Sequence, residues 1–378
     1  MIRLLHTADW QIGKPFGGFD EERRAELRAA RFASVSRMAA LAAARGVAAV
    51  LVAGDAFDDN TVHDRDVNRV LDAMAAFSGP WIFLPGNHDA ATTGSVWGRM
   101  RGLAQRRGLA NVVVADEPEP IVTCEGRLAV LPAPLLRRHE GADLTQWFDH
   151  AETPSSAVRV GLAHGALENR LPEGADAGNP IAEARATTAR LDYLALGDWH
   201  GFLGDIAPKT VYAGTPEPDR YPANEPGFVA IVEIDGPGEA PRIERVAVAH
   251  YIWAARSLRL DGEAGDVETL LAAFVEPGRT LLRLTLAGSL PLRERVRLEE
   301  ILAHWRDRFF HLDIRDDDLF DEPDEDDLDR IDVSGFVRTA IETLRTKAAD
   351  PTDPGREAAR LAIRMAYVEH RRLTAGER

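Results

Sequence analysis

The residues of this chain that could do chemistry lie in five short polar segments, each directly after an apolar run. They are Asp9-Trp10-Gln11, Gly54-Asp55-Ala56-Phe57-Asp58, Gly86-Asn87-His88-Asp89, Ala163-His164-Gly165 and Gly197-Asp198-Trp199-His200. Together they offer carboxylate, amide and imidazole groups without sulfur, the donors that hard divalent cations prefer. Two such ions that share a carboxylate neutralise a bound phosphate and activate water for attack on phosphorus. The segments therefore indicate a two-metal centre for phosphoester hydrolysis.

Taken one at a time, these segments have ordinary structural interpretations. Asp9-Trp10-Gln11 alone is typical of a turn or helix cap, and Gly86-Asn87-His88-Asp89 alone is typical of a plain turn. His164 and His200 alone could be hydrogen-bonded histidines at strand ends, because isolated motif matches carry a high false-positive risk. The order and common placement of all five segments are what favour a shared site.

The elements that must position these segments are predicted by apolar runs that alternate with helical patterns. Strand-like runs lie at 4–8, 48–53, 81–84, 158–163, 193–196 and 228–234. Helical patterns at 20–45 and 63–77 separate the first three runs, which is typical of βαβ units with strands buried on both faces. Loops beyond the carboxyl ends of such strands form the functional crevice, so all five segments should meet at one rim. We expect an α/β fold of two sheets packed face to face with helices outside.

The composition changes near Gly236-Pro237-Gly238, and smaller units are expected after it. The predicted organisation is a main domain at 1–255, a small α/β capping domain at 256–312, an acidic linker at 313–332 and C-terminal helices at 333–378. The linker is inferred from the aspartates between 316 and 329, because a run of like charges is typical of a solvated segment.

The composition limits the possible partners and compartments. A formal net charge of −16 disfavours nonspecific coating of nucleic acid. Bound cations or a local basic strip can outweigh that charge within a Debye length. The single cysteine, Cys124, excludes an intrachain disulfide and a thiolate metal cage. The alanine-rich stretch at 38–52 is interrupted by Arg45 and Gly46, and the N-terminus lacks a leader pattern, so a cytoplasmic protein is expected.

Two further segments carry a family resemblance. The polar segments, in this order, resemble the calcineurin-like metallophosphoesterases, and His6-Thr7-Ala8-Asp9-Trp10-Gln11-Ile12-Gly13 is similar to the opening motif of that family's SbcD-type members. Tyr212-Ala213-Gly214-Thr215-Pro216-Glu217 is similar to a later Gly-Ser-Pro-Glu segment of the SbcD-type exonuclease subunits of bacterial and archaeal break-repair complexes. The resemblance extends over residues 1–235 and implies that the main domain is a nuclease domain. The remainder matches only in general plan.

The resemblance implies two sets of metal ligands that share Asp55 as a bridge. One set is Asp9, Gln11, Asp55 and His200. The other set is Asp55, Asn87, His164 and Asp198. The resemblance also implies that His88, oriented by Asp58, stabilises developing charge or protonates the leaving oxygen. A plain turn histidine is the alternative interpretation of His88.

Two positions depart from the family pattern. Gln11 and Asp198 both stand where the family usually has histidine. An amide oxygen and a carboxylate replace two imidazoles, which favours manganese or magnesium over zinc and weakens the first of the two metal sets. The same substitutions would also fit a homologue with little or no activity, because loss of one metal ligand can abolish a two-metal mechanism.

The resemblance also implies partners. Such nucleases act on DNA, work with an SMC-like coiled-coil ATPase and form homodimers through helices of the nuclease domain. Candidate phosphate contacts are Arg99, Arg101, Arg106, Arg107, Arg137 and Arg138. A solvated helix face is the alternative for these arginines. The apolar stripe of the last helix, at 356–372, could dock the ATPase or pack on its own domain.

Three functions therefore stay open from the sequence. A manganese-dependent DNA exonuclease or endonuclease of DNA repair is favoured by Thr215-Pro216-Glu217 and by the C-terminal extension. A small-molecule phosphodiesterase or phosphatase of the same fold is favoured by the acidic charge. A non-catalytic homologue with a weakened metal site is favoured by Gln11 and Asp198.

Overall fold

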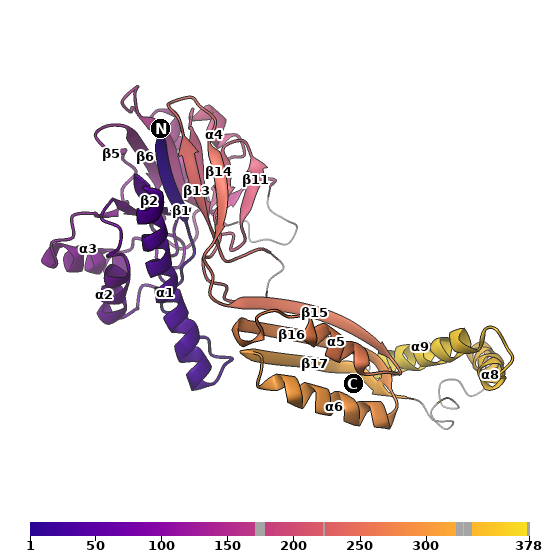
Figure 1. Cartoon of the computed structure of the whole chain (residues 1–378). Helices are drawn as coiled ribbons and strands as arrows, with labels where there is room; N and C mark the ends of the chain where they lie inside the picture. Colours follow the sequence, from indigo (N-terminus) through magenta and orange to yellow (C-terminus); the bar gives the residue numbers. More distant parts are fainter. Residues whose placement is uncertain (171–177, 222–223, 323–327, 329–334, 376–378) are drawn as a thin grey trace. The chain divides into compact units, whose positions relative to one another are not determined.

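The structure is a computed structural model that describes residues 1–170, 178–221, 224–322, 328 and 335–375. Its internal contacts divide the chain into two compact units, Met1–Tyr251 and Ile252–Arg378 (Figure 1).

The first unit contains two six-stranded sheets, of which the first has the order β14-β13-β1-β2-β3-β4. Its strands are β1 (Ile2–Thr7), β2 (Ala49–Val52), β3 (Trp81–Phe83), β4 (Val112–Val114), β13 (Phe228–Ile234) and β14 (Arg242–Ala247). Strands β1 to β4 are mutually parallel, and β13 pairs antiparallel with β1. The loops after β1, β2 and β3 therefore leave the sheet at one edge.

The second sheet has the order β11-β12-β10-β7-β6-β5 and a parallel centre made of β12, β10, β7 and β6. Its strands are β5 (Ile121–Thr123), β6 (Leu128–Ala133), β7 (Val158–His164), β10 (Tyr193–Gly197), β11 (Leu203–Ala207) and β12 (Thr210–Tyr212). Strands β8 (Ala166–Leu167) and β9 (Pro180–Ile181) form a separate two-stranded ladder. The loops after β7 and β10 also leave together, because these strands are parallel neighbours.

Three hydrophobic layers hold this unit together. Side chains such as Leu4 and Leu51 from the first sheet pack against Val130 and Leu162 from the second. The outer face of the first sheet packs against α1 (Glu21–Arg45), α2 (Asp64–Ala73) and α3 (Val96–Arg106), as Figure 1 shows. The outer face of the second sheet packs against η1 (Leu144–Asp149) and α4 (Arg185–Thr188). The expected sandwich of two sheets with helices outside is confirmed.

The second unit is built on a parallel three-stranded sheet. Its elements are β15 (Ile252–Asp261), α5 (Gly265–Ala272), η2 (Pro277–Arg279), β16 (Thr280–Leu290), α6 (Leu292–Arg306), β17 (His311–Asp321), α8 (Phe336–Ala349) and α9 (Arg356–Ala375). Leucines of β16 and the buried faces of α5 and α6 form its core. Ile341 of α8 packs against Ile363 of α9. Across the described helices of both units, none has a stretch long and apolar enough to cross a membrane.

The prediction of a solvated linker at 313–332 does not hold for its first part. Residues 311–321 form β17, which pairs along its length with β16. The acidic residues are compatible with a strand because arginines neutralise some of them; Asp313, for example, accepts from Arg283 at 2.8 Å. Charge patterning alone missed the backbone pairing of an edge strand. Most of the remaining predicted linker, at 323–327 and 329–334, lies outside the described residues.

Two glycines of the first unit differ in backbone conformation, so alanine substitutions at them should have opposite effects on stability. Gly46 ends α1 in the left-handed region, at φ 58° and ψ 44°, whereas Gly98 lies within α3. A Cβ atom added at either position would meet no atom within 4 Å, so only conformational effects remain. We expect Gly46→Ala to lower the free energy of unfolding by about 1 kcal/mol. Gly98→Ala should raise it by about 0.5–1 kcal/mol.

Urea unfolding followed by tryptophan fluorescence measures both changes. The two substitutions add the same methyl group, so each serves as the control for the other. Equal shifts of the unfolding midpoint in the same direction would contradict this account.

Candidate metal centre

The loops after β1 and β2 continue the pairing of the two strands. Ala53 donates its backbone N–H to the carbonyl of Thr7 at 2.8 Å, and Asp9 donates to the carbonyl of Gly54 at 3.1 Å. Gln11 then donates to the carbonyl of Asp55 at 2.9 Å. These main-chain bonds hold Asp9 and Asp55 side by side just beyond the sheet edge.

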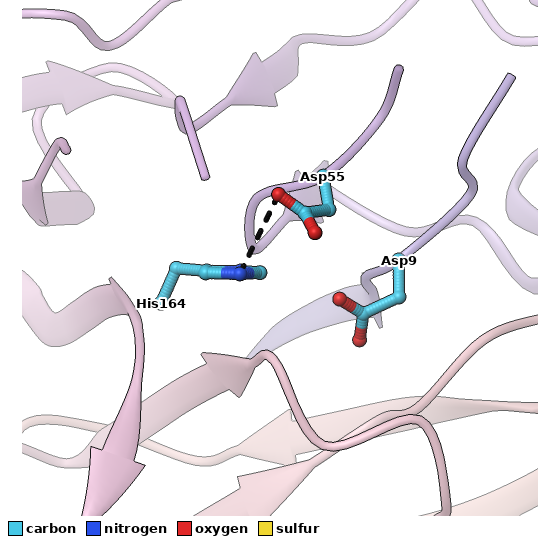
Figure 2. A group of neighbouring side chains, drawn as sticks. All are labelled: Asp9, Asp55 and His164. Atoms are coloured by element: carbon cyan, nitrogen blue, oxygen red, sulfur yellow. Dashed lines mark ion pairs between the residues drawn. The ribbon is translucent and has the colours of Figure 1, made fainter. Parts of the chain in front are cut away.

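Asp9, Asp55 and His164 converge on one point (Figure 2). One ligand atom from each lies within 4.8 Å of those of the other two, and all three residues are buried. The dashed line in Figure 2 joins Asp55 Oδ1 and His164 Nε2, which are 3.5 Å apart. Carboxylate and imidazole groups gathered at this distance form a candidate cation-binding cluster.

The orientation of the His164 ring is fixed by a hydrogen bond to Ala53, the residue directly after β2. Its Nδ1 donates to the carbonyl oxygen of Ala53 at 2.8 Å, which turns Nε2 toward the carboxylates of Asp55 and Asp198. A metal-binding histidine is usually oriented by such a bond from its other nitrogen. Burial alone would lower the pKa of His164, but Asp55, Asp198 and Asp9 raise it to about 9. In the absence of a cation, the carboxylates therefore retain a proton on this ring.

Asp198 and Asn87 complete this side of the cluster. The backbone N–H of Asp198 donates to Asp9 Oδ1 at 3.2 Å, and Asn87 Nδ2 donates to Asp198 Oδ1 at 3.3 Å. Three buried atoms here, Asp9 Oδ2, Asn87 Oδ1 and His164 Nε2, have no hydrogen-bond partner in the described part of the chain. Buried polar atoms are rarely left unpaired, and each of these can bind a divalent cation, His164 Nε2 after it loses its proton. The residues on this side fit a metal ion.

Gln11 and His200 lie next to one another, but their polar atoms are engaged within the protein. Lys14 Nζ donates to Gln11 Oε1 at 2.9 Å, and Gln11 Nε2 lies 3.4 Å from His200 Nε2. His200 Nδ1 lies 3.1 Å from a guanidinium nitrogen of Arg220. The structure thus brings together all seven predicted metal ligands, in two groups with different surroundings.

The backbone is strained where the predicted ligands lie. Asp9, Gln11, Asp55 and Asp198 have φ values of 53°, 44°, 53° and 98°. Residues other than glycine rarely adopt such values, at a cost of about 1–3 kcal/mol each. Strain of this kind persists where the surrounding structure holds it for function, and the bonded loops supply that support here.

Two glycines make room for the ligands. A Cβ atom at Gly54 would lie 2.2 Å from His164 Nδ1, and one at Gly86 would lie 2.2 Å from Asp55 Oδ1. Gly54 also has a φ of +89°. Both positions therefore require glycine for the cluster to close.

His88 lies beside the cluster, and its ring contacts Asp58 through the main chain. Its Nδ1 lies 2.9 Å from the backbone carbonyl oxygen of Asp58, so the main chain of Asp58 is the contact that orients the ring. The backbone N–H of His88 donates to Asp55 Oδ1 at 2.9 Å. Burial raises the pKa of the Asp58 carboxyl group, and the nearby charges of Lys14 and His88 oppose that rise.

Several residues that shape the site had no predicted role. Asp89 is buried and accepts from the backbone N–H groups of Gly86 and Phe57, which ties the two loops together. Burial and Asp55 raise the pKa of Asp89 to about 8. Asp219 is also buried and forms an ion pair with Lys14 at 2.7 Å. Asp89 is part of a segment that had been singled out, Lys14 follows another, and Asp219 follows the Thr215-Pro216-Glu217 segment. Their positions next to these segments were the signal that the sequence offered.

The arginines proposed for DNA are largely engaged in ion pairs. Arg99 contacts Asp64, Arg101 contacts Asp116, Arg107 contacts Asp72 and Arg137 contacts Glu140. The described structure gives Arg106 and Arg138 no ion pair with a carboxylate. These contacts favour the alternative of a salt-bridged surface for four of the six residues.

A two-sheet sandwich with a buried cluster of carboxylate, amide and imidazole groups at its strand exits defines a metal-dependent phosphoesterase. Residues 2–202 match the family described as calcineurin-like phosphoesterase. The chain therefore belongs to the calcineurin-like phosphoesterases, a family of hydrolases that use divalent metal ions.

Individual relatives are distant. The chain is 27% identical to the DNA double-strand break repair protein Mre11 of Aeropyrum pernix over 270 residues, which cover 66% of this chain and 61% of that protein. The chain thus spans about three fifths of that relative's length. The crystal structure of TT1561 of Thermus thermophilus has a TM-score of 0.40 and 13% identity, and the match covers 65% of this chain and 99% of that one.

Gly54→Ala should weaken metal binding because its new methyl group would displace the His164 ring. We expect Mn²⁺ affinity, measured by isothermal titration calorimetry, to fall by at least about tenfold. Gly94→Ala is the matched control, since Gly94 has a similar φ of +78° but no atom within 4 Å of the added Cβ. Equal losses of affinity in the two variants would show that strain, and not contact with His164, is responsible.

The affinity for Mn²⁺ should rise with pH. Below pH 9 a cation must displace the proton from His164, whose pKa is about 9, and below pH 6 it must also displace one from Asp9, whose pKa is raised to about 6 by burial. Releasing one proton makes binding about tenfold tighter per pH unit between about pH 6.5 and 8.5. Calorimetry in buffers of different ionisation enthalpy counts the protons released, and a count of zero would contradict this reading.

Proposed function

We propose that this chain is a manganese-dependent phosphodiesterase that cleaves DNA as the nuclease subunit of a break-repair complex. The observation that carries the proposal is the set of unpaired, buried ligand atoms of Asp9, Asn87 and His164 at the strand exits of the described structure. The similarity to Mre11 of Aeropyrum pernix supports DNA as the substrate class. Magnesium is the alternative metal, and a cytoplasmic location stays a prediction.

The ligand chemistry supports a hard cation. Asp9, Asp55, Asn87, His164 and Asp198 would hold it through three carboxylates, one amide oxygen and one imidazole nitrogen. Oxygen donors dominate this set, which suits Mn²⁺ or Mg²⁺ better than zinc. The family resemblance assigns Gln11 and His200, together with Asp9 and the bridging Asp55, to another ion.

The protein residues would position the substrate and handle one proton. A bound divalent cation supplies Lewis acidity and lowers the pKa of water near it. Hydrolysis forms a bond from water oxygen to phosphorus and breaks the bond from phosphorus to the leaving oxygen, which must take up a proton. His88 lies at the rim of the cluster, with Nδ1 held by the Asp58 carbonyl oxygen. Its Nε2 could therefore donate that proton or stabilise the developing charge.

The proposed partners rest on the resemblance and on the relative. A coiled-coil ATPase and a second copy of this chain remain proposals. Within the second unit, Val368 of α9 is buried, and Ile363 packs against α8, so part of the apolar stripe is covered internally. Met365 remains 46% exposed. These contacts support the interpretation that α9 packs mainly within its own unit.

A small-molecule phosphodiesterase is the second candidate. The net charge of −16 disfavours long-range attraction of DNA, and most of the proposed DNA-contacting arginines are ion-paired. A non-catalytic homologue is the third, because Gln11 and Asp198 replace histidines. Substrate assays separate these possibilities.

Purified protein with Mn²⁺ should cleave single- or double-stranded DNA, and Asp55→Ala should abolish the cleavage. His88→Ala should lower kcat by about 10²–10⁴-fold, because it removes a positioned proton donor. His304→Ala, at an exposed histidine of α6, is the control and should keep full activity. Turnover of only bis-p-nitrophenyl phosphate or cyclic nucleotides would replace this proposal with the second candidate. Inactivity on every substrate would favour the third.

A further inference from the structure

The two groups of predicted ligands differ in the charge around them. On one side, the carboxylates of Asp9, Asp55 and Asp198 surround the His164 ring. On the other side, three cationic side chains contact one carboxylate, Asp219. They are Lys14 at 2.7 Å, Arg220 at 3.1 Å and Arg31 at 3.8 Å. Asp58 also lies close to Lys14 and Arg31 on this side.

Lys14 is held at the centre of the second side. Its Nζ lies 2.7 Å from Asp219 Oδ2 and 2.9 Å from Gln11 Oε1. The Asp219 side chain is 1% exposed and that of Lys14 is 24% exposed, so a buried carboxylate anchors an ammonium group that reaches solvent. Arg31, 2% exposed, donates to the carbonyl oxygen of Trp10 and supports the same carboxylate.

This ammonium group fixes the Gln11 amide. An ammonium only donates hydrogen bonds, so the amide oxygen must face Lys14 and the NH₂ group must face His200 Nε2, 3.4 Å away. The Gln11 amide oxygen and His200 Nε2, which the resemblance assigns to the same ion as Asp9 and Asp55, are therefore engaged within the protein. Asp9 Oδ2, Asn87 Oδ1 and His164 Nε2, by contrast, have no hydrogen-bond partner among the described residues.

A second divalent ion would have to enter beside a fixed positive charge. Like charges repel strongly in a partly buried site, whereas the carboxylate side gains from a cation. Gln11 offers a neutral amide in place of the usual histidine, and Lys14 already holds that oxygen. Gln11 and His200 therefore do not fit a metal ion.

We propose that this chain holds one divalent cation, on the Asp9, Asp55 and His164 side, and that the ammonium group of Lys14 supplies the positive charge of the second. The inference rests on the proposed function, because it concerns how the same site binds a phosphodiester. Lys14 would contact a non-bridging phosphate oxygen, while Gln11 and Asp219 act as positioning residues. Gln11, in place of the family's histidine, and Lys14 would then act together, because the Gln11 amide oxygen accepts from the Lys14 ammonium group.

The metal content and the Mn²⁺ electron paramagnetic resonance spectrum test this without an activity assay. Full-length protein is dialysed against Mn²⁺, and the bound metal per chain is measured by mass spectrometry. We expect one ion and the six-line signal of an isolated Mn²⁺ in the wild type. Gln11→His combined with Lys14→Met should bind a second ion and show an exchange-coupled signal. Lys209→Met, at a lysine that donates to the Leu191 carbonyl oxygen, is the matched control and should bind one ion.

Two bound ions in the wild type would overturn the proposal, and so would a double variant that folds yet binds only one. No bound ion in the wild type would overturn the proposed metal-dependent function together with this inference. One ion in the wild type with DNA cleavage absent would leave the inference standing while the proposed substrate fails. If the double variant does not fold, as judged by circular dichroism, the wild-type count and the single variant Lys14→Met decide the question.

Discussion

The mutual repulsion of carboxylates at one buried point is the constraint on which the rest of this site depends. Asp9 and Asp55 are buried, Asp198 lies next to them, and His164 is the cationic side chain between them. Burial raises the pKa of Asp9 to about 6 despite the opposing effects of His200 and His164. The folded chain therefore carries an unfavourable concentration of charge that a bound cation removes. Function and stability are coupled at this point, because a ligand that binds only the folded state stabilises it.

The fold withstands this repulsion because rigid elements hold the loops. Main-chain bonds tie the β1 and β2 exits, and Asp89 ties the β2 exit to the β3 exit through the N–H groups of Phe57 and Gly86. Trp10, next to Asp9, packs edge-on against Trp81 and Phe83 in the core, with ring centroids 6.1 and 5.5 Å apart. That packing anchors the strained residues on either side of it. A site built on strand ends is more precise than one built on free loops.

The sequence predicted the sandwich and the candidate ligands because both follow from short-range patterns. Continuous apolar runs revealed the buried parallel strands, and the polar residues after them had to share an edge once the strands were parallel. Contacts between distant segments were not predictable. Asp219 is such a case: nothing around it in the sequence indicates that it is buried beside Lys14 and Arg31. Strand β17 was missed for a related reason, since its pairing with β16 is a backbone property that its aspartates conceal.

The distribution of positive charge constrains how DNA could reach this site. With a net charge of −16 and four of the six predicted surface arginines in ion pairs, the described surface offers little long-range attraction for a polyanion. The cations around Asp219 act only over a Debye length, about 8 Å at physiological salt, so they attract a phosphate that is already close. Such a site can select a phosphodiester that has already reached it, but it does little to speed the diffusional association of that phosphodiester with the protein. A separate partner that recruits DNA would supply the long-range attraction that the described surface does not provide. A small diester would not need this recruitment.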